Sequence, residues 1–164
     1  MEEQDKIIKN TQNILNKLIS EEIIASSLYY GALNNVKIEQ RGLIAKKFEE
    51  IAKDEFMDHA HSLMKFATEN GFDVPFKFKD MEKHSSKKMV AMFNNLKSKQ
   101  DALYYIEYGI ESEKDAIKSY EECMQQDYMY DLQPILLKCY YDEIEHLENL
   151  ETLMSCVSIG VELK

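Results

Sequence analysis

The 164-residue sequence has few residues that end or interrupt helices: five Gly and two Pro, with no Trp. This composition predicts long helices joined by few loops. No hydrophobic run approaches the roughly 18 residues needed to span a membrane. The N-terminal segment 1–5 is acidic and shows no hydrophobic signal sequence. The three cysteines form no CxxC pair, which indicates reduced thiols and a cytoplasmic protein.

Basic residues are also in the minority. The chain has 20 Lys+Arg against 30 Asp+Glu, which gives a formal net charge of −10. Nucleic-acid binding needs a basic patch, and membrane-surface binding usually needs a basic amphipathic helix, so the sequence argues against both. A negative surplus can attract cations. The length predicts a single domain over residues 1–164.

The spacing of apolar residues predicts four long helices, at 5–38, 41–70, 98–127 and 132–158. Asn70-Gly71 predicts the end of the second helix. Ser98, with Asp101 three residues later, predicts the start of the third. We also expect a short helix at 81–95.

The connection between the second and third long helices has about 25 residues and includes Pro75 in the non-helical segment 72–80. This length suits a crossover along the bundle, so that the second and third helices run parallel. The other two connections are short and predict antiparallel hairpins. The expected fold is therefore an all-α four-helix bundle with one long crossover.

The first and third helices each carry one glutamate in an otherwise apolar or aromatic seam. Glu22 interrupts the first seam, formed by Leu15, Leu18, Ala25, Tyr29, Ala32 and Val36. Glu113 interrupts the second, formed by Leu103, Ile106, Ile110, Ile117, Tyr120 and Met124. A carboxylate that faces a core must be paired, hydrogen-bonded, protonated or metal-bound. For either residue alone, a position at the seam edge or a bond to a buried tyrosine is the simpler interpretation.

The two halves of the chain correspond, which links the two glutamates. The motif Glu-x-x-Ala-x-x-x-Tyr occurs at residues 22–29 and again at 113–120. The following long helices carry His59 in one half, and Glu143 with His146 in the other. This pattern indicates a duplicated hairpin with the same inward polar positions in both copies.

Glu143 and His146 are three residues apart, so both side chains can bind one ion from the same helix face. Carboxylate and imidazole together suit first-row transition metals better than calcium. One Glu from each of two helices, with Glu-x-x-His from each of the other two, is the ligand pattern of di-iron and di-manganese bundles.

Residues 14–25 and 142–151 resemble the first and last bundle helices of bacterioferritins, in the ferritin-like superfamily, with rubrerythrins second. The resemblance covers the four helices. It implies two iron ions, with manganese possible, and oxidation of Fe(II) by O₂ or H₂O₂ in a cage-forming subunit that stores iron. The ligands it implies are Glu22, His59, Glu113, Glu143 and His146, with Glu113 or Glu143 as a bridge.

The second helix departs from this family pattern. Bacterioferritins have a glutamate three residues before the histidine, where this chain has Phe56; Glu55 lies four residues before His59. Either a π-helical turn absorbs an extra residue and returns Glu55 to the site, or Phe56 fills the core and the site has lost a carboxylate.

The resemblance implies roles for two further residues. Met57 stands where bacterioferritins place the methionine that binds haem between two subunits, although packing at a surface is an alternative role. Tyr29 is expected to hydrogen-bond a ligand carboxylate or to transfer an electron.

Two other functions stay open at this level. One is a rubrerythrin-like dimer that reduces peroxide; it would need a separate electron donor, because the chain has no four-cysteine iron domain. The other is a bundle whose metal site has degenerated, and Phe56 is the residue that suggests it.

Overall fold

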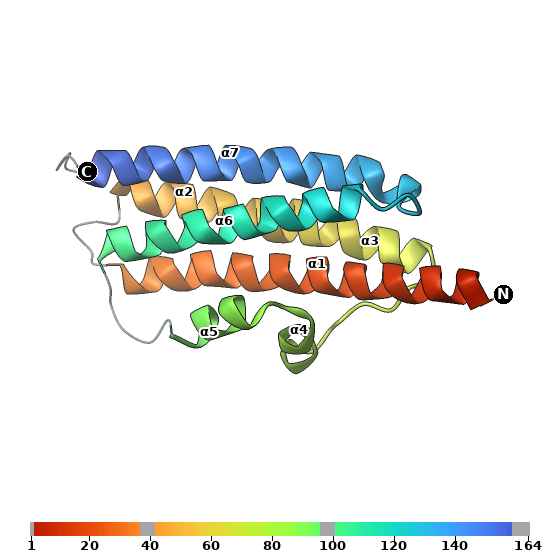
Figure 1. Cartoon of the computed structure of the whole chain (residues 1–164). Helices are drawn as coiled ribbons and strands as arrows, with labels where there is room; N and C mark the ends of the chain where they lie inside the picture. Colours follow the sequence, from red (N-terminus) through yellow and green to blue (C-terminus); the bar gives the residue numbers. More distant parts are fainter. Residues whose placement is uncertain (1, 37–41, 96–100, 159–164) are drawn as a thin grey trace.

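Four long helices run alongside one another in the computed structural model (Figure 1). The structure describes residues 2–36, 42–95 and 101–158. The long helices are α1 (Glu2–Asn35), the continuous run of α2 (Gly42–Lys53), η2 (Asp54–Ala60) and α3 (His61–Glu69), then α6 (Ala102–Met124) and α7 (Gln133–Ser158). The described residues include no strand, and none of their helices is long and apolar enough to cross a membrane. The prediction of an all-α bundle is confirmed.

The crossover connects opposite ends of the bundle. After α3 the chain returns along α1 through α4 (Phe78–His84) and α5 (Lys87–Asn95), and both short helices pack on α1 (Figure 1). As a result α6 runs parallel to α2 and α3, and antiparallel to α1 and α7, as the sequence predicts. A single 3₁₀ turn, η3 (Tyr130–Leu132), leads from α6 into α7.

The second long helix ends at Asn70-Gly71, as predicted. Gly71 has a positive φ of 74°, a conformation that glycine adopts without steric cost. The Gly71 N–H donates to the Thr68 carbonyl, and the Phe72 N–H donates to the Ala67 carbonyl at 2.8 Å. These two bonds form a Schellman motif, which satisfies carbonyl groups that the helix end would otherwise leave open.

The short crossover helix differs from the prediction in two ways. The single helix expected at 81–95 is divided, because Ser85 is extended and Ser86 caps α5 by accepting a hydrogen bond from the Met89 N–H at 3.1 Å. The first of the two helices already begins at Phe78, inside the segment expected to be non-helical.

The start predicted for the third long helix is also wrong. The helix begins at Ala102, and Asp101 takes the N-cap position with an extended backbone (ψ 150°). Ser98 lies outside the described residues.

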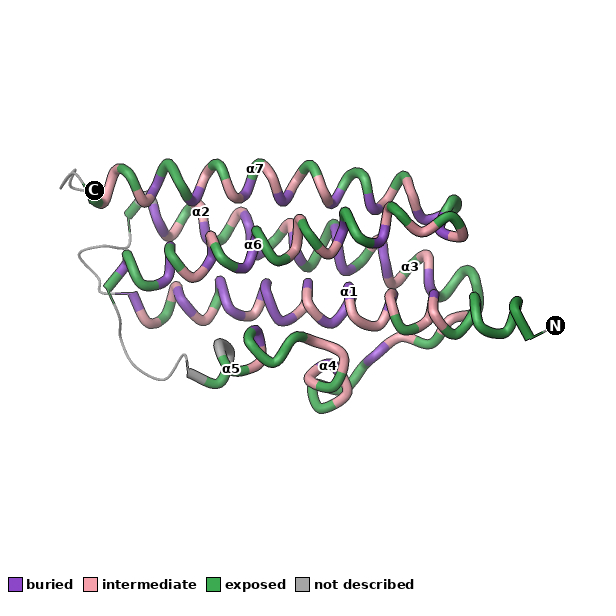
Figure 2. The backbone as a smooth tube through the Cα atoms, in the orientation of Figure 1, coloured by how far each residue is buried: buried purple, intermediate pink, exposed green. Residues whose placement is uncertain are grey.

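Buried residues face the space between the four long helices (Figure 2). The α1 seam is buried throughout, including Glu22. The α6 seam requires a correction, because Leu103 is 36% exposed. The buried row on α6 instead passes through small residues at Ala102 and Gly109, which allow neighbouring helices to approach closely.

The π-helical turn η2 keeps both ends of the second helix facing the core. The buried positions include a row at Ile51, Glu55, His59, Leu63 and Ala67, and Ile44, Phe48, Ala52 and Ala60 are buried as well. The members of this row are four residues apart, and in a regular α-helix each such step rotates the face by about 40°. The wider π-turn absorbs one extra residue and removes most of this drift. Phe56 lies in the turn and is 44% exposed.

Deletion of Phe56 tests whether η2 is a local insertion. We expect the turn to become regular α-helix, because the residues on either side keep their faces. The thermal midpoint should then stay within about 4 °C of the wild-type value.

Deletion of Ile144 is the matched control, because α7 is regular α-helix between Glu143 and His146. It should rotate the rest of α7 out of register and lower the midpoint by more than about 10 °C. Equal losses for the two deletions, measured by circular dichroism, would show that η2 is not a separable insertion.

Candidate metal centre

Six buried polar residues meet in the middle of the bundle, and none is more than 4% exposed. They are Glu22 from α1, Glu55 and His59 from η2, Glu113 from α6, and Glu143 and His146 from α7. These are the six metal-site residues singled out in the sequence, and the fold brings all of them together. Glu55 lies in the cluster and Phe56 does not, so the structure shows the π-turn alternative.

The cluster divides into two groups that share two residues. One group is Glu22, Glu55, His59 and Glu143; the other is Glu55, Glu113, Glu143 and His146. Within each group, one potential ligand atom per residue lies within 4.8 Å of all the others. The two imidazole ring centres are 5.8 Å apart. Glu55 and Glu143 therefore occupy the shared, central positions, and Glu113 belongs to one group alone.

The cluster has too few hydrogen-bond donors for its carboxylate oxygens. His59 Nδ1 lies near three carboxylates, at 3.3 Å from Glu22 Oε2, 3.5 Å from Glu55 Oε2 and 3.3 Å from Glu143 Oε1. One ring nitrogen carries at most one proton, so it cannot satisfy all three. Glu143 Oε1 is buried and has no partner in hydrogen-bond geometry. A cation is the chemical species that such a surplus of acceptors fits.

The second imidazole has the same arrangement. His146 Nδ1 lies 3.3 Å from Glu143 Oε2 and 3.6 Å from Glu55 Oε1. The outer nitrogens of both rings contact aspartates of the opposite hairpin: His59 Nε2 is 3.1 Å from Asp142, and His146 Nε2 is 3.4 Å from Asp54. Metal-binding histidines commonly use their second nitrogen in this way, because it fixes the orientation of the ring.

Sequence reasoning missed the role of these two aspartates. Lys138 Nζ holds Asp142 at 2.6 Å, which fixes the outer partner of His59. The signal was present in the repeated doublets Asp54-Glu55 and Asp142-Glu143, whose aspartates directly precede the two shared glutamates.

Two buried tyrosines support the other pair of glutamates. The Tyr29 hydroxyl of α1 donates to Glu113 of α6, and the Tyr120 hydroxyl of α6 donates to Glu22 of α1. Each copy of the Glu-x-x-Ala-x-x-x-Tyr motif thus supplies the donor for the glutamate of the other. Gly109 leaves space for Tyr29, because an added Cβ would lie only 2.9 Å from its hydroxyl oxygen.

Burial sets the protonation of the metal-free cluster. Desolvation and the charges of Glu55 and Glu143 raise the pKa of both Glu22 and Glu113 well above the usual range. Burial also acts to raise the pKa of Glu143, but hydrogen bonds with His146 and other neighbours lower it.

The histidines respond in the opposite direction. Burial alone would lower the pKa of His146, but hydrogen bonds with Glu143 and Glu55 raise that pKa to about 12. The pKa of His59 is raised for the same reason. These shifts favour the protonated forms of Glu22, Glu113 and the two imidazoles, which lowers the negative charge of the cluster.

The donor set fits a pair of first-row transition-metal ions. Four carboxylates and two imidazoles suit iron or manganese, and the placement on four helices is that of dinuclear carboxylate bundles. Met57 lies outside the cluster and is 63% exposed. Haem binding at Met57 stays a prediction from the resemblance.

The protonation pattern predicts how pH affects the metal-free protein. The raised pKa values of Glu22, Glu113 and His146 contribute stability below their unfolded values of 4.5 and 6.5, and this contribution is lost as the pH rises. The lowered pKa of Glu143 acts the other way and costs stability only below about pH 4.5. Between about pH 5.5 and 8.5 the free energy of unfolding of chelator-treated protein should therefore fall.

Glu113→Gln is the matched variant, since glutamine resembles the protonated side chain. It should make the pH slope shallower by about 1 kcal/mol per pH unit, measured by urea unfolding. Bound metal should reverse the trend, because its ligands must be deprotonated. A metal-free protein that gains stability over this range would contradict the assignment.

Comparison with known proteins places this geometry in a family. Residues 12–157 match the family described as Ferritin-like domain. A solved structure with a similar fold is the bacterioferritin-related protein from Bacteroides fragilis, described as a dodecameric thioferritin; it is 21% identical, and the match covers 96% of this chain and 95% of that one with a TM-score of 0.78. No curated protein matches the sequence. Because the family match spans nearly the whole bundle, including all six clustered side chains, this chain belongs to the ferritin-like domain family.

Proposed function

We propose that this protein binds two iron ions at the six clustered residues and oxidises Fe(II), with O₂ or H₂O₂ as the oxidant. The observation that carries the proposal is the burial of four carboxylates and two imidazoles in two overlapping groups of possible metal ligands. Two divalent cations would supply four positive charges, which equals the charge of the four carboxylates. Manganese satisfies the same donors and is the alternative metal.

The two groups suggest a role for each ligand. Glu22 and His59 would hold one ion, and Glu113 and His146 the other. Glu143, with Glu55, belongs to both groups and is the candidate bridge. Hard carboxylate oxygens favour Fe(III) over Fe(II), so the bound metal would supply electrons to an oxidant more readily than hydrated Fe(II) does.

Tyr29 has a positioning role in this proposal. Its hydroxyl donates to Glu113 and so orients that carboxylate before metal binds. Tyr120 does the same for Glu22. The degenerate-site alternative loses its main support, because Glu55 supplies the carboxylate that Phe56 seemed to replace.

Iron storage is the second part of the proposal and requires an assembly that encloses mineral. A dodecameric relative with the same fold supports a homo-oligomer. We place the protein in the cytoplasm, since its three cysteines are free thiols, as expected in a reducing compartment.

Aerobic addition of Fe(II) to metal-free protein tests the oxidation site. Glu113→Ala and His146→Ala each remove a ligand from one group and should slow the growth of ferric absorbance at least about tenfold. Glu107→Ala is a matched control, because Glu107 is exposed on the same helix and lines neither cavity that approaches the cluster. Wild-type rates in both ligand variants would show that oxidation occurs elsewhere.

The mass of the assembly in solution tests storage. We expect a closed shell of about a dozen chains or more, by light scattering of purified protein, because storage needs an enclosed volume. A stable dimer would instead favour the rubrerythrin-like alternative, in which the same centre reduces peroxide with electrons from a partner.

A further inference from the structure

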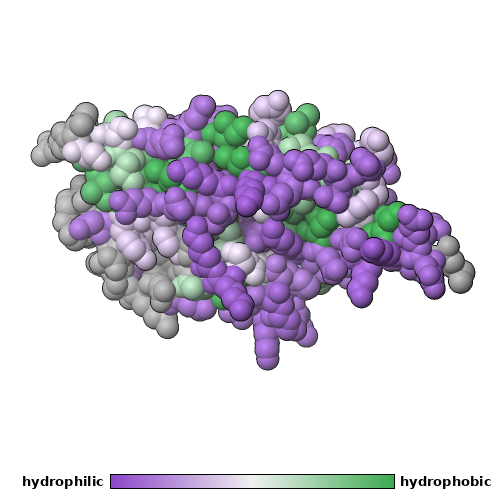
Figure 3. Space-filling view, viewed as in Figure 1, coloured by the Kyte–Doolittle hydropathy of each residue, from purple (hydrophilic) through white to green (hydrophobic). Residues whose placement is uncertain are grey.

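A cavity of about 300 Å³ between α1 and α6 leads from the surface to the six clustered side chains. Its inner wall includes three of the cluster glutamates: Glu22, Glu55 and Glu113. Its outer wall carries charged residues of α6: Asp115, Lys118 and Glu122. Hydrophilic residues cover the middle of this face of the molecule (Figure 3). We call this cavity the α1–α6 passage.

The carboxylates that line the α1–α6 passage range from exposed to buried. The exposed fraction of the side chain falls from 61% at Glu122 to 13% at Glu21 and 4% at Glu22. Carboxylates therefore line the route from solvent to the cluster, which is the chemistry that a hydrated divalent cation can follow.

A second cavity, of about 340 Å³, approaches the cluster from the opposite side, between the second long helix and α7. Of the described residues that line it, none is a cluster glutamate. It meets His146 together with Asp54 and Asp142, which contact the outer nitrogens of the two imidazoles. This second cavity therefore reaches the outer side of the imidazoles, whereas the α1–α6 passage reaches the carboxylates of the cluster.

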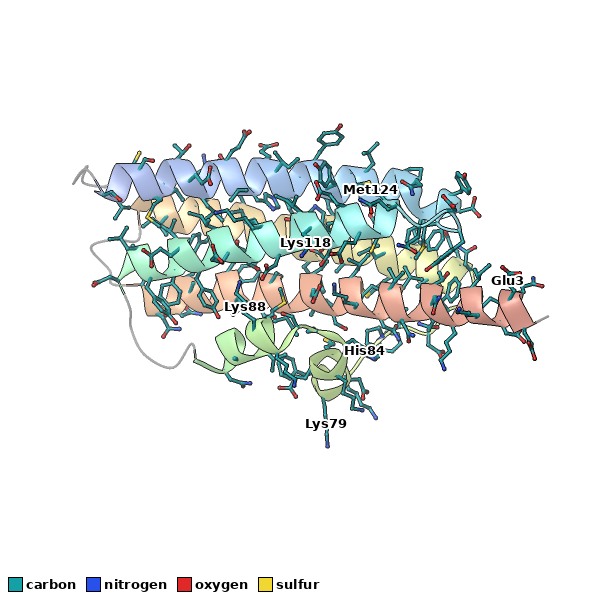
Figure 4. All side chains as sticks on the ribbon, viewed as in Figure 1. Glu3, Lys79, His84, Lys88, Lys118 and Met124 are labelled. Carbon is teal, nitrogen blue, oxygen red and sulfur yellow. The ribbon has the colours of Figure 1, made fainter. Side chains whose placement is uncertain are left out.

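Two contacts hold the start of the crossover helix α5 against α1 and α6, at the α1–α6 passage. The Ser86 N–H donates to Glu21 Oε1 at 3.1 Å, next to the cluster residue Glu22. Lys88 Nζ reaches α6, where it lies 2.9 Å from Asp115 and 3.5 Å from Glu111. Figure 4 shows Lys88 and Lys118 on the face where α5 and α6 flank α1.

We propose that Fe(II) reaches the cluster through the α1–α6 passage and that Lys88 is the gate at its entrance. The proposal rests on the proposed iron-binding function. Paired Lys88 neutralises Asp115 and places a positive charge in the path of a cation. When Lys88 swings away, the two carboxylates that it held become available to attract and pass on the ion.

Removal of the Lys88 charge tests the gate. Stopped-flow absorbance of Co(II) binding to the metal-free full-length protein measures entry without any redox chemistry. Lys88→Gln should raise both the association and the dissociation rate by about threefold or more at low ionic strength, with an unchanged equilibrium affinity. High salt should reduce this gain.

Lys47→Gln is the matched control on the opposite side, since Lys47 lines the second cavity and pairs with Glu50 at 3.0 Å. It should leave both rates unchanged. An unchanged or slower association in Lys88→Gln, or an equal gain in Lys47→Gln, would overturn the gate.

Narrowing each cavity tests the route itself. Ala116 lines the α1–α6 passage, so Ala116→Leu should slow Co(II) association about tenfold while the final spectrum stays that of the wild type. Asn149→Leu narrows the second cavity and should not affect the rate. If Asn149→Leu is the slow variant, or if Ala116→Leu binds at the wild-type rate, the route is wrong.

The outcomes also separate the two proposals. A wild-type protein that binds no Co(II) at equilibrium overturns the metal centre and the route with it. Normal equilibrium binding with unaffected rates in the Lys88 and Ala116 variants overturns the route alone. If Ala116→Leu does not fold, the comparison of Lys88→Gln with Lys47→Gln decides the question.

Discussion

The burial of four glutamates in the middle of a small bundle is the constraint on which the rest of this structure depends. Carboxylates out of water need compensating charge or hydrogen bonds. Here the compensation comes from two tyrosine hydroxyls and two imidazoles, and it is incomplete, because one imidazole nitrogen of His59 faces three carboxylates at once. Apolar clusters lie on both sides of this polar layer along the bundle. A buried cluster with this excess of carboxylates favours the binding of cations.

Each hairpin supplies hydrogen-bond partners for the buried polar groups of the other, so the packing of the two hairpins and the geometry of the site depend on each other. Tyr29 of the first hairpin supports Glu113 of the second, and the outer nitrogen of His59 contacts Asp142. In return, Tyr120 of the second hairpin supports Glu22 of the first, and the outer nitrogen of His146 contacts Asp54. Neither hairpin alone has a full set of partners for its buried charges. The polar layer therefore favours the one packing in which the two copies face each other.

The π-turn and the crossover give this chain its own form of the common plan. The π-turn brings Glu55 to the cluster although Phe56 interrupts the usual spacing, and turns of this kind are frequent at functional sites. The crossover adds α4 and α5 outside the four-helix core, on the face where cluster carboxylates open toward solvent. Both features change the surroundings of the cluster, which still consists of four carboxylates and two imidazoles.

The sequence by itself determined the helical class, the long crossover and the duplicated inward positions, because these follow from periodicity and spacing along single helices. For Glu55 the sequence left two alternatives: a π-turn that brings it to the site, or a site without that carboxylate. The tertiary structure decided between them, since a π-turn depends on which face must meet the core. Only packing between helices showed Leu103 to be exposed and paired the aspartates of each doublet with the opposite histidine. Those contacts join residues more than 80 positions apart, and no local pattern encodes them.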